Sequence, residues 1–171
     1  MAPVVVLIGP PGSGKSSVGV VLARLLGTDL RDTDADVEAA EGRSVADIFV
    51  SDGEQYFREV ERVAVATAIA EHDGVLSLGG GAPIDGETQS LLAQYAAGGG
   101  TVAFLDVGLT AAVPRVGLNA TRPLLLGNPR QKWLALMNER RPVYERLATV
   151  TVLTDNRKPS QIAAEIAQAV S

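Results

Sequence analysis

Gly9-Pro10-Pro11-Gly12-Ser13-Gly14-Lys15-Ser16 is the stretch that decides the fold. It matches the phosphate-loop pattern G-x-x-x-x-G-K-[S/T] and follows an apolar run over residues 4–8, which is the context that the motif requires. Small residues let successive backbone N–H groups turn toward a phosphate, and the helix that follows points its positive end at the same anion. In this pattern Lys15 reaches the β- and γ-phosphates, and the Ser16 hydroxyl binds Mg²⁺. The stretch therefore predicts a nucleotide-binding site.

Length, charge and cysteine content narrow the class of protein. The 171 residues predict one domain, 1–171, and the net charge of −5 argues against a nucleic-acid surface. The absence of cysteine removes disulfides and thiolate metal sites, and it fits a reducing cytoplasm. The apolar run near the start lacks the basic flank of a signal peptide and leads into the phosphate loop. It is therefore predicted to be a core strand. We expect a cytoplasmic protein with no nucleic-acid or membrane partner.

Strand and helix patterns alternate along the whole chain. Strands are expected at residues 4–8, 30–31, 75–78, 101–105 and 149–153, and helices at 15–26, 34–41, 53–71, 86–96, 110–116, 128–146 and 159–170, with a short turn starting at Ser44. This alternation predicts a three-layer α/β/α domain with about five parallel strands and helices on both faces. Residues 117–129 have few periodic apolar positions and predict an irregular, mobile loop.

The expected site lies at the carboxyl ends of the strands, where sites form in such sheets. Asp32 and Asp34 follow the second strand, and their carboxylates can serve one pocket. One could hold the water shell of a metal ion while the other accepts a proton from an attacking hydroxyl. The alternative is that Asp34 only caps the next helix, and the residues themselves leave both open.

Three glycines and two arginines are further candidates for the site at the carboxyl ends of the strands. Residues 79–81 lack side chains, which suits a place where something approaches the backbone closely, although an ordinary turn is the alternative. Arg58 has Glu54 and Glu61 at helical spacing, and Arg140 lies late on another expected helix. Two guanidiniums converging on a pocket suit a carboxylate, which Arg binds bidentately. Surface ion pairs are the alternative for each arginine taken alone.

In this order the motifs resemble those of the shikimate kinases, particularly the actinobacterial form. The matching segments cover essentially the whole chain: Gly-x-x-x-x-Gly-Lys-Ser, Asp-Thr-Asp, Ser-Val-Ala-Asp-Ile-Phe, Asp-Gly-Glu-Gln-x-Phe-Arg-x-x-Glu, Leu-Ser-Leu-Gly-Gly-Gly-Ala, Thr-Arg-Pro-Leu-Leu and Arg-x-Pro-x-Tyr. The resemblance implies a P-loop kinase fold with a lid at about 117–129 and a substrate-binding region at about 34–61. It implies transfer of the γ-phosphoryl group of ATP to the 3-hydroxyl of shikimate, with Mg²⁺, in chorismate and aromatic amino acid biosynthesis.

The resemblance also implies roles for individual residues. Asp34, Lys15 and Arg122 would be catalytic, with Asp34 orienting the acceptor diol and Arg122 approaching the transferred phosphoryl group. ATP would be bound by Gly12, Ser13, Gly14, Lys15, Ser16, Ser17, Arg115, Arg122, Arg157 and Pro159. Shikimate would be bound by Asp34, Phe49, Phe57, Arg58, Gly79, Gly80, Gly81, Pro123, Leu124 and Arg140. Mg²⁺ would be held by Ser16 and Asp32.

Some points stay open at this level. Arg141 duplicates Arg140, and we favour Arg140 for the pocket because it keeps the family's spacing to Pro142 and Tyr144. We interpret Trp133 and the pair Leu136 and Met137 as packing residues. Another small-molecule kinase of the same fold, such as a gluconate kinase or a nucleoside monophosphate kinase, and a non-catalytic nucleotide-binding protein are the alternatives. We expect a monomer.

Overall fold

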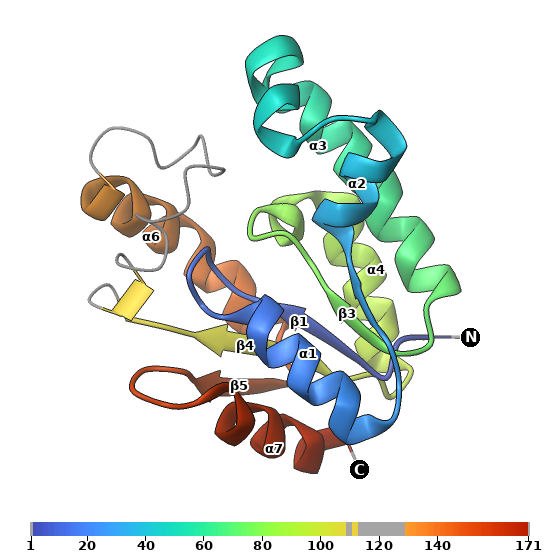
Figure 1. Ribbon diagram of the computed structural model, residues 1–171, viewed down its shortest axis with the longest axis vertical. Helices are drawn as coiled ribbons and strands as arrows, with labels where there is room; N and C mark the ends of the chain where they lie inside the picture. The colour runs from blue at the N-terminus through green and yellow to red at the C-terminus, as the bar shows by residue number, and fades with distance from the viewer. Residues whose placement is uncertain (1, 109–110, 113–128, 171) are drawn as a thin grey trace.

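The fold was analysed in a computed structural model, which describes residues 2–108, 111–112 and 129–170 (Figure 1). Most of the helix expected at 110–116 and of the loop expected at 117–129 lies outside these residues. Four residues with expected roles, Arg115, Arg122, Pro123 and Leu124, lie outside them as well.

A parallel sheet of five strands forms the centre of the described structure. The strands are β1 (Val5–Ile8), β2 (Leu30–Asp32), β3 (Val75–Ser77), β4 (Val102–Asp106) and β5 (Val150–Leu153), in the spatial order β2-β3-β1-β4-β5. All four neighbouring pairs are parallel. Every residue of β1 is fully buried, because this strand lies between β3 and β4 and is covered on both faces. The expected parallel sheet is confirmed.

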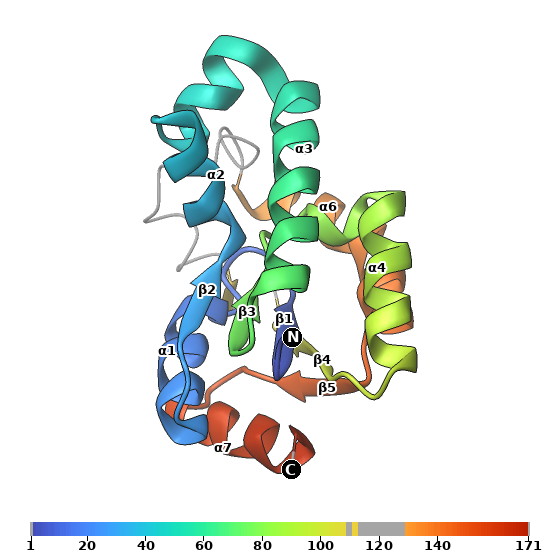
Figure 2. The ribbon, with the colours of Figure 1, turned by 90° about the vertical axis from the view of Figure 1, so that its right-hand side faces the viewer.

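Helices cover both faces of the sheet, as Figure 2 shows. One face packs against α1 (Lys15–Leu26) and α7 (Pro159–Val170), and the other against α3 (Val45–Glu71), α4 (Gly86–Ala97) and α6 (Pro129–Leu147). Each face of the sheet forms a hydrophobic cluster with the helices that cover it. Alternate residues of a strand belong to different clusters, as Val6 and Leu7 of β1 do. The expected three-layer architecture is confirmed. Among the described residues, no helix combines the length and apolarity needed to cross a membrane.

A smaller unit projects beyond the sheet edge, formed by α2 (Thr33–Glu41) and the first turns of α3 (Figure 1). Val37, Ile48 and Phe57 form its core. Ser44 caps α3 by accepting a hydrogen bond from the Asp47 amide, as its position in the sequence predicted. The sequence predicted a short turn and then a separate helix from Gly53. The structure confirms a break at Gly53, whose non-helical φ of 87° is open to glycine but strained for other residues, and it has a helix from Val45 where the sequence predicted only a short turn.

Candidate active site

The phosphate loop has the strand, loop and helix context that the sequence predicted. Gly14 adopts a left-handed conformation with φ of 90° and starts α1 at Lys15. The Lys15 side chain is buried, and its Nζ donates to the carbonyl oxygens of Gly9 at 2.7 Å and Pro10 at 3.3 Å. Ser16 and Ser17 are exposed in the first turn of α1, where unpaired helix N–H groups favour an anion.

The carboxyl end of β2 places two carboxylates in different positions. Asp32 caps α2, because its Oδ1 accepts a hydrogen bond of 2.8 Å from the Asp34 amide. The interpretation of Asp34 as the helix cap is therefore wrong. The Asp34 carboxylate lies instead against the glycine turn, 2.7 Å from the point where a Cβ on Gly79 would stand. The Gly79 amide in turn donates to Thr33 Oγ1 at 3.2 Å, which joins the ends of β2 and β3.

The three glycines leave room for side chains of the protein itself. A Cβ on Gly79 would also lie 2.9 Å from Glu61 Oε2, and one on Gly81 would lie 2.5 Å from Arg58 Nη2. Separations below about 3.0 Å force one of the atoms to shift, so a side chain at Gly79 or Gly81 would displace charged groups of α2 and α3. The close approach that the sequence predicted at this turn is confirmed, and the approaching groups are a carboxylate pair and a guanidinium.

Arg58 is held by carboxylates on its own helix, as its helical spacing predicted. Its Nη1 donates to Glu61 Oε1 at 2.8 Å, and its Nη2 to Glu54 Oε2 at 3.3 Å. Burial alone would lower the pKa of Arg58. The ion pairs with Glu61 and Glu54 have the larger effect, so the pKa of Arg58 lies above its ordinary value. The guanidinium remains charged and fixed in direction.

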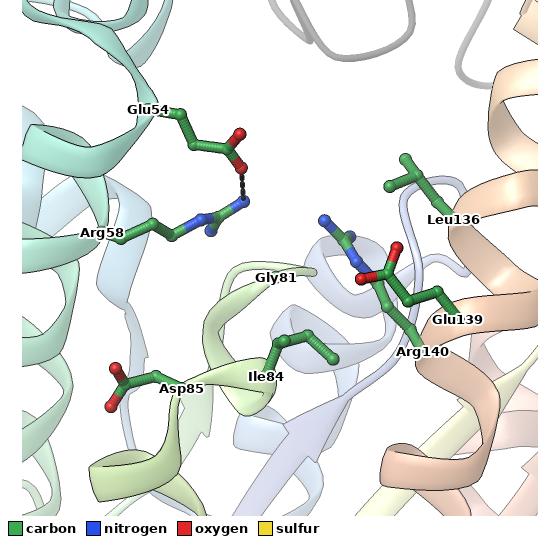
Figure 3. Close-up of a pocket in the computed structure, with 8 residues that line it drawn as sticks. All are labelled: Glu54, Arg58, Gly81, Ile84, Asp85, Leu136, Glu139 and Arg140. Atoms are coloured by element: carbon green, nitrogen blue, oxygen red, sulfur yellow. Dashed lines mark hydrogen bonds and ion pairs between the residues drawn. The ribbon is translucent and has the colours of Figure 1, made fainter.

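Arg140 faces Arg58 across a pocket of about 400 Å³. Figure 3 shows the two guanidiniums pointing toward each other from α3 and α6, with the turn at Gly81 between them. Arg140 is 6% exposed, and it forms no ion pair with any acidic residue in the described part of the chain. The charge of Arg140 acts on the buried Glu61 carboxylate, whose pKa it lowers, but without an ion pair the guanidinium can still bind an anion that a ligand brings to the pocket.

Arg141 points elsewhere. Its guanidinium pairs with both carboxylate oxygens of Asp106 at 2.9 Å and lies over the Phe104 ring, 5.9 Å from its centroid. The adjacent arginines thus occupy different environments, Arg140 in the pocket and Arg141 against the end of β4.

Known proteins are similar to this chain in sequence and in fold. The sequence model of the family described as shikimate kinase matches residues 11–171. A shikimate kinase of Streptomyces coelicolor is 53% identical over 161 residues, which are 94% of this chain and 91% of that protein. The chain belongs to the shikimate kinase family. This membership makes it an ATP-dependent kinase.

Solved structures agree with this family. A shikimate kinase from Acinetobacter baumannii, determined in complex with shikimate, superimposes with a TM-score of 0.93 at 32% identity, covering 99% of this chain and 93% of the other. A gluconokinase from Sinorhizobium meliloti reaches a TM-score of 0.62 at 21% identity, covering 97% of this chain and 90% of that one. The second likeness shows only that the two proteins share a fold.

Some residues expected in the site of a shikimate kinase do not line this pocket. Phe49 and Phe57 stack on each other with centroids 4.9 Å apart, and Phe57 is buried in the small core beneath α3. Arg157 pairs with Glu165 at 2.9 Å and donates to the Leu153 carbonyl at 2.8 Å, so it is engaged at the start of α7, where Pro159 also lies. The binding roles of these residues remain predictions.

Several side chains of this candidate site were missed from the sequence. Ile84 and Leu136 line the pocket, and Leu136 also packs against the core, so the packing interpretation is confirmed but missed its place in the pocket. Trp133 is buried in the core as expected, but its indole also reaches the phosphate loop. Tyr144 donates to the Gly80 carbonyl at 2.6 Å. In the sequence, Tyr144 stands out only as the last residue of the Arg-x-Pro-x-Tyr segment. That segment does not show which group the tyrosine hydroxyl donates to.

Glu61 is the most deeply buried carboxylate of the site, with 3% of its side chain exposed. Burial raises the pKa of Glu61, and the nearby Asp34 charge raises it further, while Arg58 and Arg140 act in the opposite direction. A carboxyl whose pKa is higher in the folded than in the unfolded protein binds more protons when folded. Its contribution to stability therefore falls as the pH rises above its ordinary value of 4.5.

We expect Glu61→Gln to remove this pH-dependent loss of stability. The unfolding temperature of the wild type relative to the variant should fall as the pH rises from 4.5, because only the wild type carries the buried charge. Thermal unfolding at a series of pH values measures this difference. Glu59→Gln, at an exposed position of the same helix, should follow the wild type. A constant difference between wild type and Glu61→Gln across the series would contradict the expectation.

Proposed function

We propose that this chain transfers the γ-phosphoryl group of ATP to the 3-hydroxyl of shikimate, giving shikimate 3-phosphate and ADP. The observation that carries the proposal is Arg140, a buried guanidinium that forms no ion pair with the described residues and faces Arg58 across the pocket. Two arginines in this arrangement suit a single carboxylate bound by both. The pocket volume of about 400 Å³ lies within the range of roughly 300–1,000 Å³ typical of small-molecule sites.

The pocket adjoins the phosphate loop at Gly80. A Cβ at this position would lie 3.5 Å from Arg140 Nη1, 3.2 Å from Pro11 Cδ and 3.5 Å from the Gly9 carbonyl oxygen. An acceptor whose carboxylate binds Arg140 is therefore close to the loop that binds the donor phosphates. Asp34, which lies against Gly79 of the same turn, would orient the acceptor hydroxyl. Phosphoryl transfer depends mainly on such positioning and on neutralisation of charge.

The loop residues fit a nucleotide that carries its own Mg²⁺. Within the described residues, no group of three or more His, Cys, Asp or Glu forms a metal cage. Mg²⁺ is commonly held by one or two protein oxygens together with substrate phosphates and water, and the Ser16 hydroxyl and Asp32 carboxylate would supply those oxygens. The Ser13 hydroxyl is buried without a hydrogen-bond partner in the described structure, and a bound phosphate would bring acceptors to this loop. When bound, the ion would neutralise phosphate charge.

A panel of acceptors tests the proposal. We expect ADP release in the presence of shikimate, Mg²⁺ and ATP, and much slower release with gluconate or with nucleoside monophosphates. A coupled assay of ADP formation measures all of them under the same conditions. Gluconate also carries a carboxylate and is the substrate class of a protein with the same fold, so it is the strictest comparison. Turnover with only one of these other acceptors would refute the proposal.

The remaining expectations concern residues that the structure does not describe, the oligomeric state and the location of the protein. Arg122 and Arg115 would approach the nucleotide phosphates and base from the part of the chain that the structure does not describe. The monomeric state and the cytoplasmic location stay predictions.

A further inference from the structure

Trp133 donates its indole N–H to the phosphate loop. The Nε1 atom lies 2.9 Å from the Pro11 carbonyl oxygen, and this hydrogen bond is buried and joins residues 122 positions apart in the sequence. Lys15 holds the two preceding carbonyl groups, those of Gly9 and Pro10. Three consecutive carbonyls of the loop are therefore fixed by side chains, two by an ammonium group and the third by the indole.

This contact fixes the direction of a backbone amide that is expected to bind phosphate. The peptide bond between Pro11 and Gly12 is planar and trans, so its N–H points away from its carbonyl oxygen. Holding the Pro11 oxygen on the Trp133 side turns the Gly12 N–H to the opposite side. Gly12 itself has φ of 82°, in a region where glycine is conformationally permissive, so the contact from Trp133 adds a restraint on this peptide plane that the backbone preference does not supply.

The indole is held rigidly by the core. Trp133 is 3% exposed and belongs to the hydrophobic cluster that contains Ile8, Leu78, Phe104 and Tyr144. Its ring is fixed by packing, and its N–H is presented to the loop by a framework that includes the strands next to that loop. A phenylalanine at this position would keep an apolar aromatic ring, smaller than the indole, but lose the donor.

The same helix also contacts the acceptor side of the site. Trp133, Arg140 and Tyr144 lie seven and eleven residues apart on α6, close to whole numbers of helical turns of about 3.6 residues, so they share one face. Tyr144 donates to the Gly80 carbonyl, and Gly80 packs against Pro11. The helix, the phosphate loop and the glycine turn thus form a closed set of contacts.

We propose that Trp133 is a positioning residue for the nucleotide phosphates, because its indole N–H holds the Pro11–Gly12 peptide with the Gly12 amide facing the phosphate site. The proposal rests on the proposed function for the identity of the nucleotide as ATP or ADP. It does not depend on which acceptor is used, since the contact is with the loop.

Trp133→Phe tests the proposal, with Tyr95→Phe as the matched control. Tyr95 also donates to a proline carbonyl, that of Pro3, at 2.7 Å, but it does so at the opposite end of β1. Each variant loses one hydrogen bond from an aromatic donor. Tyr95→Phe keeps its ring, whereas Trp133→Phe replaces the bicyclic indole by a smaller phenyl ring and also loses packing in the core. We expect Trp133→Phe to weaken ADP binding about tenfold, while Tyr95→Phe leaves it unchanged. Calorimetric titration with ADP and Mg²⁺ measures both, and thermal unfolding shows whether the stability losses are comparable.

Two further measurements separate positioning from a general loss of structure. Shikimate affinity, also measured by calorimetry, should be the same in Trp133→Phe and the wild type. Trp133 is the single tryptophan of the chain, so its fluorescence in the wild type should change when ADP fills the loop. Wild-type ADP affinity in Trp133→Phe would overturn the proposal, as would fluorescence that ADP leaves unchanged. Absence of shikimate binding in the wild type would refute the proposed acceptor and leave the comparison with ADP intact.

Discussion

Asp34→Asn should reduce kcat by about 10²- to 10⁴-fold, the range that a positioned acid–base group contributes. The substitution keeps the volume of the side chain and removes its charge, so the place against Gly79 remains filled. The acceptor hydroxyl loses the anion that orients it, while the phosphate loop is untouched. We therefore expect ADP affinity to remain at the wild-type value. Steady-state kinetics with shikimate and calorimetry with ADP give the two quantities.

Asp36→Asn is the matched control for this result. Asp36 lies on the same helix, α2, but its carboxylate pairs with Arg31 at 2.7 Å. Its removal eliminates one partly exposed ion pair, which contributes little to stability, and should leave kcat unchanged. Equal rates in Asp34→Asn and the wild type would refute the catalytic role of Asp34, and equal losses in both variants would assign the effect to α2 as a whole.

Local patterns in the sequence were sufficient to predict the sheet and the loop. The run before Gly9 is apolar throughout because a central parallel strand is buried on both faces, and the loop glycines fix where the first helix begins. Helix ends could also be predicted from nearby residues. Gly42 ends α2 and Ser44 caps the start of α3. The alternation of strands and helices then limits the topology to a small number of arrangements.

Contacts between distant segments could not be predicted in the same way. Asp32 and Asp34 are equivalent as sequence, and only the backbone geometry at the end of β2 makes Asp32 the cap. Trp133 and Pro11 are far apart in the chain, so an apolar helical stripe was the only signal that Trp133 gave. The burial of Glu61 depends on the packing of α3 against the glycine turn, which its spacing from Arg58 does not show.

Arg140 and Arg141 are adjacent in the sequence but lie in different environments in the structure. Substitution of Arg140 is expected to have the second large effect. Arg140→Met should raise the shikimate KM by at least about 30-fold, because removing one partner of a buried charge pair costs about 2–5 kcal/mol and each 1.4 kcal/mol is about tenfold. Arg141→Met should leave this KM unchanged, because its guanidinium is committed to Asp106. Initial-rate kinetics at saturating ATP compares the two variants directly.

The side effects of the two substitutions should differ in kind. Arg140→Met removes a positive charge that lowers the pKa of Glu61, so the pKa of Glu61 should rise further in that variant. Arg141→Met loses a partly exposed ion pair, so any change should appear in the unfolding temperature and not in acceptor binding. A rise in KM for Arg141→Met alone would place the carboxylate site at the end of β4. That outcome would contradict the pairing of Arg58 with Arg140, because Arg58 could not share a carboxylate with an arginine held on Asp106.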